Sequence, residues 1–544
     1  MTLPSLSHDW PPEDLPASTS APAPLPDPAE PLSWVRYLLA ALERRRAEVQ
    51  VLDDYYEGIQ PLNFDEEFRA AFGRRWARFA SNYSALVVDR LVDRLEVQGF
   101  RFADASGDAD LWDIWQANDL DGGSAMAHTE ALIKRGAYAL VEPRSDALPR
   151  ISVEDPFDAI TAPDPRDRRR RLAGLKRWID EAGHLVVYLY LPEWVASLRT
   201  RSPIPSDWTS WLDQQKAWPD SAALEPWAPA GGEPLVRNPL GVVPLVPLRN
   251  RPRLRGMGRS EIEPVTSNQD AINYFRAMTV VGARFLAYPQ RVLLNVVPEV
   301  DPTTGLPKKP FKAGMQQIWM IEPPDPDDLA PFEPKVESFA AADLTPLLRL
   351  VEGEVRAMAA VAGMPYELLL GQTSLLPESG EAKKSGEAAL VQKLARIQVS
   401  LGEDWEIVMR TALRAMGDPR ADTLRAETRW RSTETRNEAV RTDSVVKQFA
   451  AGLIDAETAR EQLGYSVEQI ARMRDRDVER QARDPQARMA ELVEAVGGVE
   501  RARSFLEGIA HQEAATPSAP APTGPRMSAI DTEQKDSPRR PSGA

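Results

Sequence analysis

Two stretches of the sequence decide the fold, SEIEPVTSNQDAINYFRAMTVVGARFL at residues 260–286 and TPLLRLVEGEVRAMAAVAGM at residues 345–364. In both, apolar or small residues recur at spacings of three, four or seven, which predicts two long helices. The start of the first helix stays open: Ser260 with Glu263 fits a capping box, whereas Pro264 suits a first helical position. The periodic positions are Val265, Ile272, Phe275, Thr279, Gly282 and Leu286, then Leu344, Leu347, Leu348, Val351, Val355, Met358 and Ala362.

The second helix has clear start and stop signals. Thr345 followed by Pro346 is typical of a cap and a first helical residue, and Gly363 with Pro365 ends the pattern. A third helix is expected at 380–415. The segment between the first two helices contains two expected strands, 291–297 and 316–321.

The other segments predict an α+β chain that is mainly helical. Residues 151–197 are expected to form a β-meander, and the Pro- and Trp-rich segment 202–239 an irregular loop. Tails at 1–30 and 512–544 are expected to be disordered. Further helices are expected at 32–56, 64–95, 110–116, 123–135, 445–450, 456–463 and 467–483, and further strands at 96–102, 137–142, 151–153, 159–161, 173–179, 185–190 and 242–246.

Composition narrows the classes of protein. The chain has 544 residues, of which 43% are hydrophobic, enough for a sizeable core, and it has no cysteine. We expect no secretory signal and no membrane span, because no uncharged apolar window of sufficient length occurs. The formal net charge of −15 argues against binding nucleic acid by counterion release. The acidity fits either plain solubility or a conduit to which DNA must not adhere.

Motifs for chemistry are absent from the sequence. It has no phosphate-binding G-x-x-x-x-G-K-[ST] motif, and its four histidines are scattered without a metal-binding spacing. The run 118–123, NDLDGG, lacks the length and the terminal Glu of a calcium loop. We therefore predict no enzyme, no cofactor and no metal site.

Several short motifs together resemble the portal proteins of long-tailed bacteriophages (siphophages), which form head-to-tail connectors. The resemblance covers most of residues 31–510, and its specificity lies in the order and spacing of the motifs. They are YYEG at 55–58, NY at 82–83, RLEVQGF at 94–100, GRSEI at 258–262, QDAI at 269–272, YPQR at 288–291, GMPYELLLG at 363–371 and SGEA at 379–382.

The resemblance implies a portal architecture with a wing of helices and β-meander, a helical stem, a small α/β clip and a helical crown. It also implies the following division of the chain: disordered tail 1–30, wing 31–256, first stem helix 257–286, clip 287–338, second stem helix 339–370, tunnel loop 371–380, long helix and wing 381–434, crown 435–511, disordered tail 512–544.

The implied function is that of a virion protein assembled in the host cytoplasm. About twelve copies would form a ring at one capsid vertex, through which double-stranded DNA is packaged and ejected. The implied partners are other copies of the chain, the terminase large subunit, the major capsid and scaffolding proteins and a head–tail connector protein, with no membrane. The alternatives are a capsid or minor head protein without a pore, or a hydrolase with an unrecognised carboxylate pair.

The resemblance also suggests roles for three basic groups. Lys383 and Lys384 follow the implied tunnel loop and are candidates to face DNA, although an exposed pair without a ligand explains them equally well. Three lysines in the implied clip and three arginines before the first stem helix are candidates for partner and subunit contacts. The clip lysines are Lys308, Lys309 and Lys312, and the arginines are Arg251, Arg253 and Arg255.

Overall fold

The computed structural model describes residues 25–27, 30–60, 81–102, 109–145, 148–204, 224–229, 232–254, 257–287, 291–294, 302–304, 335–338, 343–370, 380–433, 438–465 and 467–483. The chain divides into two compact units, Met1–Ile470 and Ala471–Ala544. All contacts discussed below lie in the first unit. None of the described helices has the length and hydropathy needed to cross a membrane.

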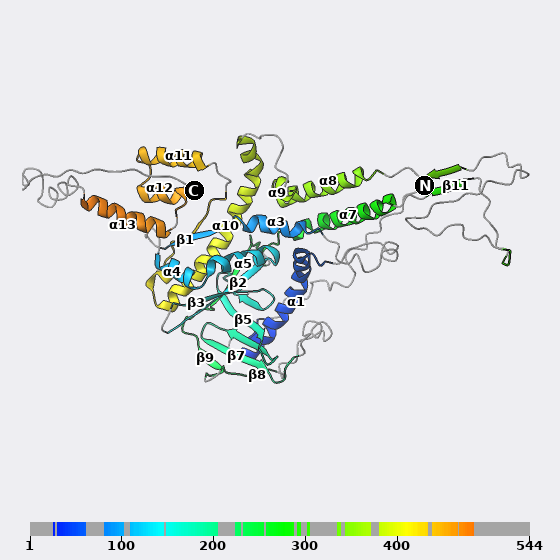
Figure 1. Cartoon of the computed structure of the whole chain (residues 1–544). Helices are drawn as coiled ribbons and strands as arrows, with labels where there is room; N and C mark the ends of the chain where they lie inside the picture. The colour runs from blue at the N-terminus through cyan, green and yellow to red at the C-terminus, as the bar shows by residue number, and fades with distance from the viewer. Residues whose placement is uncertain are drawn as a thin grey trace, which may run out of the picture. The chain divides into compact units, whose positions relative to one another are not determined.

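The fold class is confirmed as α+β and mainly helical (Figure 1). The helices are α1 Pro31–Glu57, α3 Tyr83–Val92, α4 Ala109–Ala117, α5 Leu120–Ile133, α7 Thr266–Ala287, α8 Thr345–Ala362, α9 Glu367–Leu370, α10 Gly380–Met416, α11 Glu438–Ala450, α12 Ala456–Leu463 and α13 Val467–Arg483, with 3-10 turns η3 Glu263–Val265 and η4 Pro419–Asp422. The strands are β1 Val97–Phe102, β2 Gly136–Glu142, β3 Arg150–Glu154, β4 Ala159–Pro163, β5 Arg171–Ile179, β6 Leu185–Tyr190, β7 Trp194–Thr200, β8 Leu224–Pro226, β9 Leu235–Arg237, β10 Leu245–Arg249, β11 Arg291–Leu294, β12 Lys335–Ser338 and β13 Ala426–Trp430.

The largest sheet is an antiparallel meander in the order β4-β5-β6-β7-β8, with β9 also paired to β7. Two predictions are corrected here. The expected first strand of the meander, 151–153, lies within β3, which pairs with β2 in a separate three-stranded sheet, β10-β2-β3. The segment 202–239 contains two short strands, β8 and β9, whose three residues each are too few to show a period.

Two further sheets have two strands each. β1 pairs with β13, so that Phe102 lies opposite Ala426, although the two residues are far apart in the sequence. β11 pairs with β12. The expected strand at 316–321 lies outside the described residues, and of the expected helix at 64–95 the structure describes only the part containing α3.

The long helix α10 runs through the main core. Its buried residues recur at spacings of three and four, from Leu390 through Trp405 to Leu413, and they pack with α3, α4, α5 and the β2 sheet. Helix α1 serves two cores: its first half, around Leu38, packs against the meander, whereas Leu52 joins the main cluster. The predicted boundaries of α1 and α10 are confirmed to within one residue.

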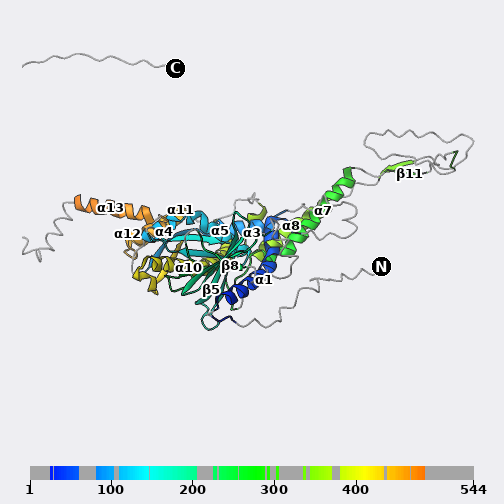
Figure 2. The same cartoon turned by 90° about the horizontal axis from the view of Figure 1, so that it is seen from below.

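Helices α7 and α8 form an antiparallel hairpin and lie side by side in Figures 1 and 2. Asn268 of α7 donates a hydrogen bond to Glu354 of α8 over 3.0 Å. The buried apolar residues of the hairpin gather where it joins the body. Further along it, Val280, Leu348 and Leu350 are 39%, 53% and 47% exposed, respectively.

The start of α8 differs from the prediction. Thr345 is the first helical residue rather than the cap, and its backbone N–H donates to the Asp343 carboxylate over 2.9 Å. A short carboxylate accepts this unpaired N–H better than the threonine hydroxyl, which is already inside the helix. The predicted end at Gly363 is confirmed, because this residue adopts the left-handed conformation (φ 68°) that closes the last turn.

Candidate functional site: the hairpin root

The α7–α8 hairpin joins the body at a set of buried polar contacts that we call the hairpin root. It comprises residues 257–273 and 354–364 together with the side chains from α1, the turn before α3 and α10 that contact them. Most of the short motifs quoted above lie within it, although they are up to 300 residues apart in the sequence.

Gly258 begins the root at a close approach between backbones. A Cβ atom added there would lie 2.7 Å from the Asn250 carbonyl oxygen and still closer to the carbonyl oxygen of Arg135. The backbone N–H of Arg259 donates to the same Asn250 carbonyl over 2.8 Å. Only glycine fits this position, because any side chain would collide with rigid backbone.

The start of the first helix, which the sequence left open between Ser260 and Pro264, uses both residues. The Ser260 hydroxyl accepts hydrogen bonds from the backbone N–H groups of Ile262 and Glu263, at 3.1 and 3.3 Å. A 3-10 turn with Pro264 in its first positions follows, and α7 begins at Thr266. Tight 3-10 turns are frequent at helix ends. Here Ser260 caps the turn with its hydroxyl, and Pro264 lies near the start of the turn.

Glu261 supplies a buried carboxylate to the root. Its side chain is 2% exposed, and it forms ion pairs with Arg251 and, at 2.5 Å, with Lys393 of α10. The Asn250 side-chain amide donates to the same carboxylate over 2.7 Å. Burial opposes the charge of Glu261, but Lys393 and Arg251 outweigh it and lower the pKa of the carboxyl below its ordinary value.

Two buried amides fasten α7 to the start of α3 and the turn before it. The Gln269 carbonyl oxygen accepts hydrogen bonds from the backbone N–H groups of Tyr83 and Ser84, at 2.9 and 3.0 Å. The Asn273 side-chain oxygen accepts from the backbone N–H of Ser81 over 2.9 Å. Both amides are buried, and their oxygens accept hydrogen bonds from backbone N–H groups, as buried polar groups in native proteins usually do.

A tyrosine from α1 completes the root. The Tyr55 hydroxyl donates to Asp270 over 2.8 Å, and burial raises the pKa of that aspartate. Beside it, the Tyr56 hydroxyl donates to Asp89 over 3.0 Å, and burial with this hydrogen bond raises the tyrosine pKa to about 12. Both tyrosines therefore stay protonated and donate at any physiological pH.

Two arginines of the basic segment before the hairpin form ion pairs within the chain. Arg249 forms an ion pair with the buried carboxylate of Asp404 at 2.7 Å, and Arg251 pairs with Glu261. Arg253 is exposed. Arg255 lies outside the described residues. The sequence singled out the segment but not its partners, because Asp404 lies 155 residues away.

Arg45 of α1 is also used within the chain. Its guanidinium donates to the Tyr138 hydroxyl over 2.7 Å and to the carbonyl of Ala159 over 2.5 Å, so it joins α1 to two sheets. Arg46 lies over the ring of Phe157. Only Arg44 of the three is fully exposed, because the neighbouring sheets cover the other two.

The remaining candidate residues have no described side chains. Lys383 and Lys384 lie in the first turns of α10, where only the backbone is described. Lys308, Lys309 and Lys312 lie outside the described residues. Their suggested contacts stay predictions.

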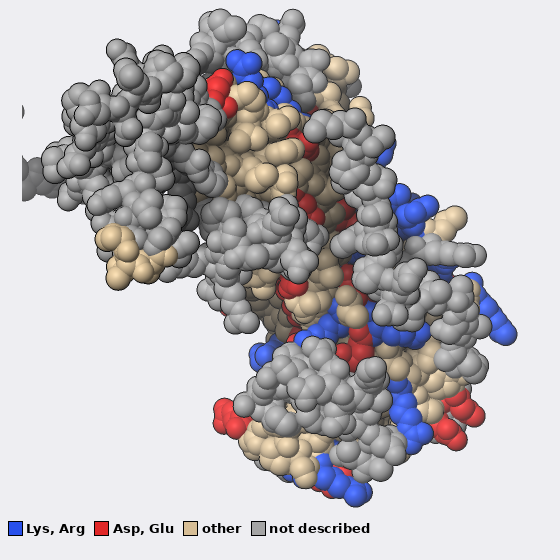
Figure 3. Space-filling view, turned by 90° about the vertical axis from the view of Figure 1, so that its right-hand side faces the viewer, with Lys and Arg blue, Asp and Glu red and all other residues tan. Residues whose placement is uncertain are grey.

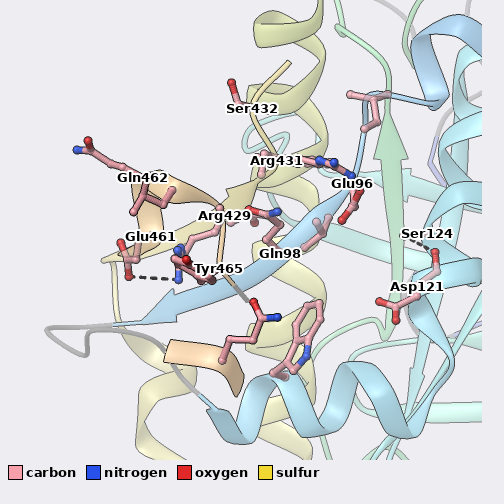
Figure 4. A pocket seen from close by; sticks show the side chains of 18 of the residues that line it. Glu96, Gln98, Asp121, Ser124, Arg429, Arg431, Ser432, Glu461, Gln462 and Tyr465 are labelled. Atoms are coloured by element: carbon pink, nitrogen blue, oxygen red, sulfur yellow. Dashed lines mark hydrogen bonds and ion pairs between the residues drawn. The ribbon is translucent and has the colours of Figure 1, made fainter. Parts of the chain in front are cut away.

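A large groove of about 1340 Å³ lies between β1, β13 and the end of α12 (Figure 4). Its basic side chains are paired: Arg429 contacts Glu461 at 3.2 Å and Arg431 contacts Glu96 at 2.8 Å. Each of these two arginines is therefore held by a carboxylate that also lines the groove.

The described charged side chains on one face of the molecule are mixed in sign. On the face in Figure 3, the described basic and acidic side chains are interspersed without a continuous basic surface. No group of three or more His, Asp or Glu side chains suited to a metal ion occurs in the part of the chain that the structure describes.

The described geometry is that of an α+β body to which a helical hairpin is fixed by buried polar contacts. The chain belongs to the phage portal protein family, since the family model described as "Phage portal protein, SPP1 Gp6-like" matches residues 35–482. This confirms the resemblance and the interpretation as a portal protein.

Two portal proteins of mycobacterial phages are similar in sequence. The chain is 32% identical to the portal protein of Mycobacterium phage D29 over 418 residues, which cover 74% of this chain and 79% of that protein. It is 31% identical to the portal protein of Mycobacterium phage L5 over 421 residues, with the same coverage.

Solved structures of gene transfer agent (GTA) particles also match at 11% sequence identity. The neck of a native particle, computed with C12 symmetry, aligns with a TM-score of 0.38 over 77% of this chain and 99% of that chain. The virion of a native particle aligns with a TM-score of 0.36 over 76% of this chain and 99% of that chain.

Proposed function

We propose that about twelve copies of this portal protein form a closed ring at one capsid vertex of the virion, after assembly in the host cytoplasm. The ring is the channel through which double-stranded DNA enters during packaging and leaves during ejection. The α7–α8 hairpin lines the channel, and the protein acts by geometry and electrostatics rather than by catalysis.

The exposed apolar residues of the hairpin support this proposal. Leu348 and Leu350 are about half exposed, and Val280 more than one third, on two helices whose buried apolar residues, among those described, lie near the body. A helix that keeps leucines in water has a surface suited to another chain. In a cyclic ring every subunit presents one face to one neighbour and a different face to the other, so such a surface is covered on assembly.

Net charge supports a channel that DNA passes without adhering. Twelve copies would carry about −180 formal charges. A wall of that sign repels a duplex that carries one negative charge per about 1.7 Å. Within this wall, Lys383 and Lys384 are the proposed DNA-facing cations.

The proposed partners follow from the same function. The segment 287–338, with Lys308, Lys309 and Lys312, would meet the terminase large subunit and later the head–tail connector. Arg253 and Arg255 would contact a neighbouring subunit. The major capsid and scaffolding proteins would surround the ring.

Negative-stain electron microscopy with native mass spectrometry of the purified chain tests the ring. We expect discrete rings with a central hole and a mass of about twelve subunits. Sheets or shells would favour a capsid protein without a pore, and a chain that stays monomeric under assembly conditions would overturn the proposal.

A further inference from the structure

One lysine of α10 contacts the segment just before α7 and the last residue of α8, which are the two chain ends of the hairpin and both lie in the hairpin root. The Lys393 ammonium lies 2.5 Å from the Glu261 carboxylate, just before α7 begins. The same ammonium donates to the carbonyl of Ala362, the last residue of α8, over 2.7 Å. The aliphatic stem of the lysine also passes the cap of α8, since a Cβ added at Gly363 would lie 3.8 Å from the lysine Cδ.

These contacts are buried. The Lys393 side chain is 12% exposed and that of Glu261 is 2% exposed. Burial, together with the nearby Arg251, lowers the pKa of Lys393 although Glu261 opposes the shift. A buried charge of this kind is retained in a folded protein only if its partners hold it in a fixed geometry.

The two ends are also held separately by backbone contacts. The N–H of Glu261 donates to the Leu132 carbonyl of α5 over 2.8 Å. The N–H of Met364 donates to the Ala359 carbonyl over 3.0 Å and closes α8. Lys393 therefore links Glu261 to the end of α8. Each of these two segments also has a backbone hydrogen bond of its own, so neither depends on Lys393 alone.

We infer that Lys393 is a positioning residue that makes α10 and both ends of the α7–α8 hairpin move as one unit. Lys393 lies thirteen residues, or about 20 Å, after the start of α10. Because α10 is one continuous helix, a displacement at its first turns reaches the hairpin through this ammonium. The biological meaning of the coupling rests on the proposed channel function, in which Lys383 and Lys384 in the first turns of α10 face DNA.

The test is hydrogen exchange, followed by mass spectrometry, on the full-length protein and on K393M, K393R and the control K447M. Lys447 makes an exposed ion pair with Asp443 in α11, far from the hairpin in sequence, so K447M makes the same substitution without touching the root. The amides to follow are those of Glu261 and Val265 at one end, and those of Gly363 and Met364 at the other.

We expect K393M to raise exchange by about tenfold or more at both ends together, while α5 and the second half of α10 stay unchanged. K393R retains a donor and a charge, and should restore most of the protection. A change at one end alone, no change at either end, or an equal change in K447M would overturn the inference. If K393M does not fold, K393Q is measured and judged by the same outcomes.

Ring formation is measured on the same variants and separates the two proposals. Rings of K393M with loosened hairpin ends would support both. Failure of the unsubstituted chain to form rings would overturn the proposed function, whereas the exchange result would still decide the coupling.

Discussion

Gly258 lies between the backbone carbonyls of Arg135 and Asn250, with no room for a side chain. We predict that Gly258→Ala destabilises the protein by about 3 kcal/mol or more, because two rigid segments must separate to admit the methyl group. Urea unfolding followed by circular dichroism measures the loss.

Gly353 supplies the matched control for that substitution. It lies in α8, and an added Cβ would meet nothing within 4 Å. Gly353→Ala should leave stability unchanged or raise it by about 0.5–1 kcal/mol, since alanine is the better helix former. Equal effects of the two alanines would refute the steric argument.

His128 is fully buried, and its ring accepts a hydrogen bond from the Trp405 indole over 2.9 Å. Burial lowers the pKa of this histidine from 6.5 to about 4. As the pH falls, His128 is therefore protonated near pH 6.5 in the unfolded chain but only near pH 4 in the native protein. Stability contributed by the neutral ring is complete above pH 6.5 and is lost as the pH falls toward 4.

We predict that His128→Gln removes this slope. Between pH 7 and pH 5 the unsubstituted protein should lose about 2 kcal/mol through His128, and the glutamine variant should not, because its amide still accepts from Trp405 but does not titrate. Unfolding free energies at the two pH values measure the difference. An unchanged slope in the variant would assign the pH dependence to other groups.

For single residues, the sequence indicated which positions matter but not which contacts they make. The GRSEI and QDAI motifs contain Gly258, Glu261 and Gln269, all of which lie in the hairpin root. Their partners could not be predicted, because Lys393 and Ser84 lie more than a hundred residues away and no local pattern links them. Buried polar residues were also hidden by the apolar periodicity on which the helix prediction depends.

Among the elements, the α7–α8 hairpin makes the most direct prediction about assembly. Leu348→Ser together with Leu350→Ser replaces side chains that are about half exposed, so the monomer should lose less than about 1 kcal/mol of stability. Ring formation should fall markedly if these leucines contact a neighbouring subunit. Thermal unfolding and negative-stain imaging measure the two effects.

Leu424 offers the control, since it is 95% exposed and lies outside the hairpin. Leu424→Ser should change neither stability nor ring formation. Unimpaired rings in the double serine variant would show that these two leucines do not lie at the subunit contact.

Helices were predicted better than strand partners. The bounds of α1 and α10 follow from the apolar period, and the end of α8 follows from Gly363, which are local signals. The partners of β1 and β3 depend on contacts between distant segments, and alternation within a strand does not identify the strand beside it. The error at β3 therefore has the same origin as the missed pairing of β1 with β13.

For the whole molecule, the net charge of −15 predicts how salt affects assembly and DNA binding. Repulsion between like-charged subunits should weaken rings at low ionic strength, and about 0.15 M salt should favour them by screening. Analytical ultracentrifugation over a salt series measures the assembly.

A 30-base-pair duplex followed by fluorescence anisotropy should show no binding at 0.15 M salt, and tight binding would contradict the proposed repulsive wall.

The pairing of β1 with β13 has a consequence for synthesis on the ribosome. Phe102 cannot pair with Ala426 until that residue has been synthesised, 324 residues later. At about 5–20 residues per second, this delay lasts roughly 15–65 seconds. During that time Phe100 and Phe102, both fully buried in the finished protein, lack part of their cover. A nascent chain of this kind is a natural client for chaperones, and slower translation should increase its loss to aggregation.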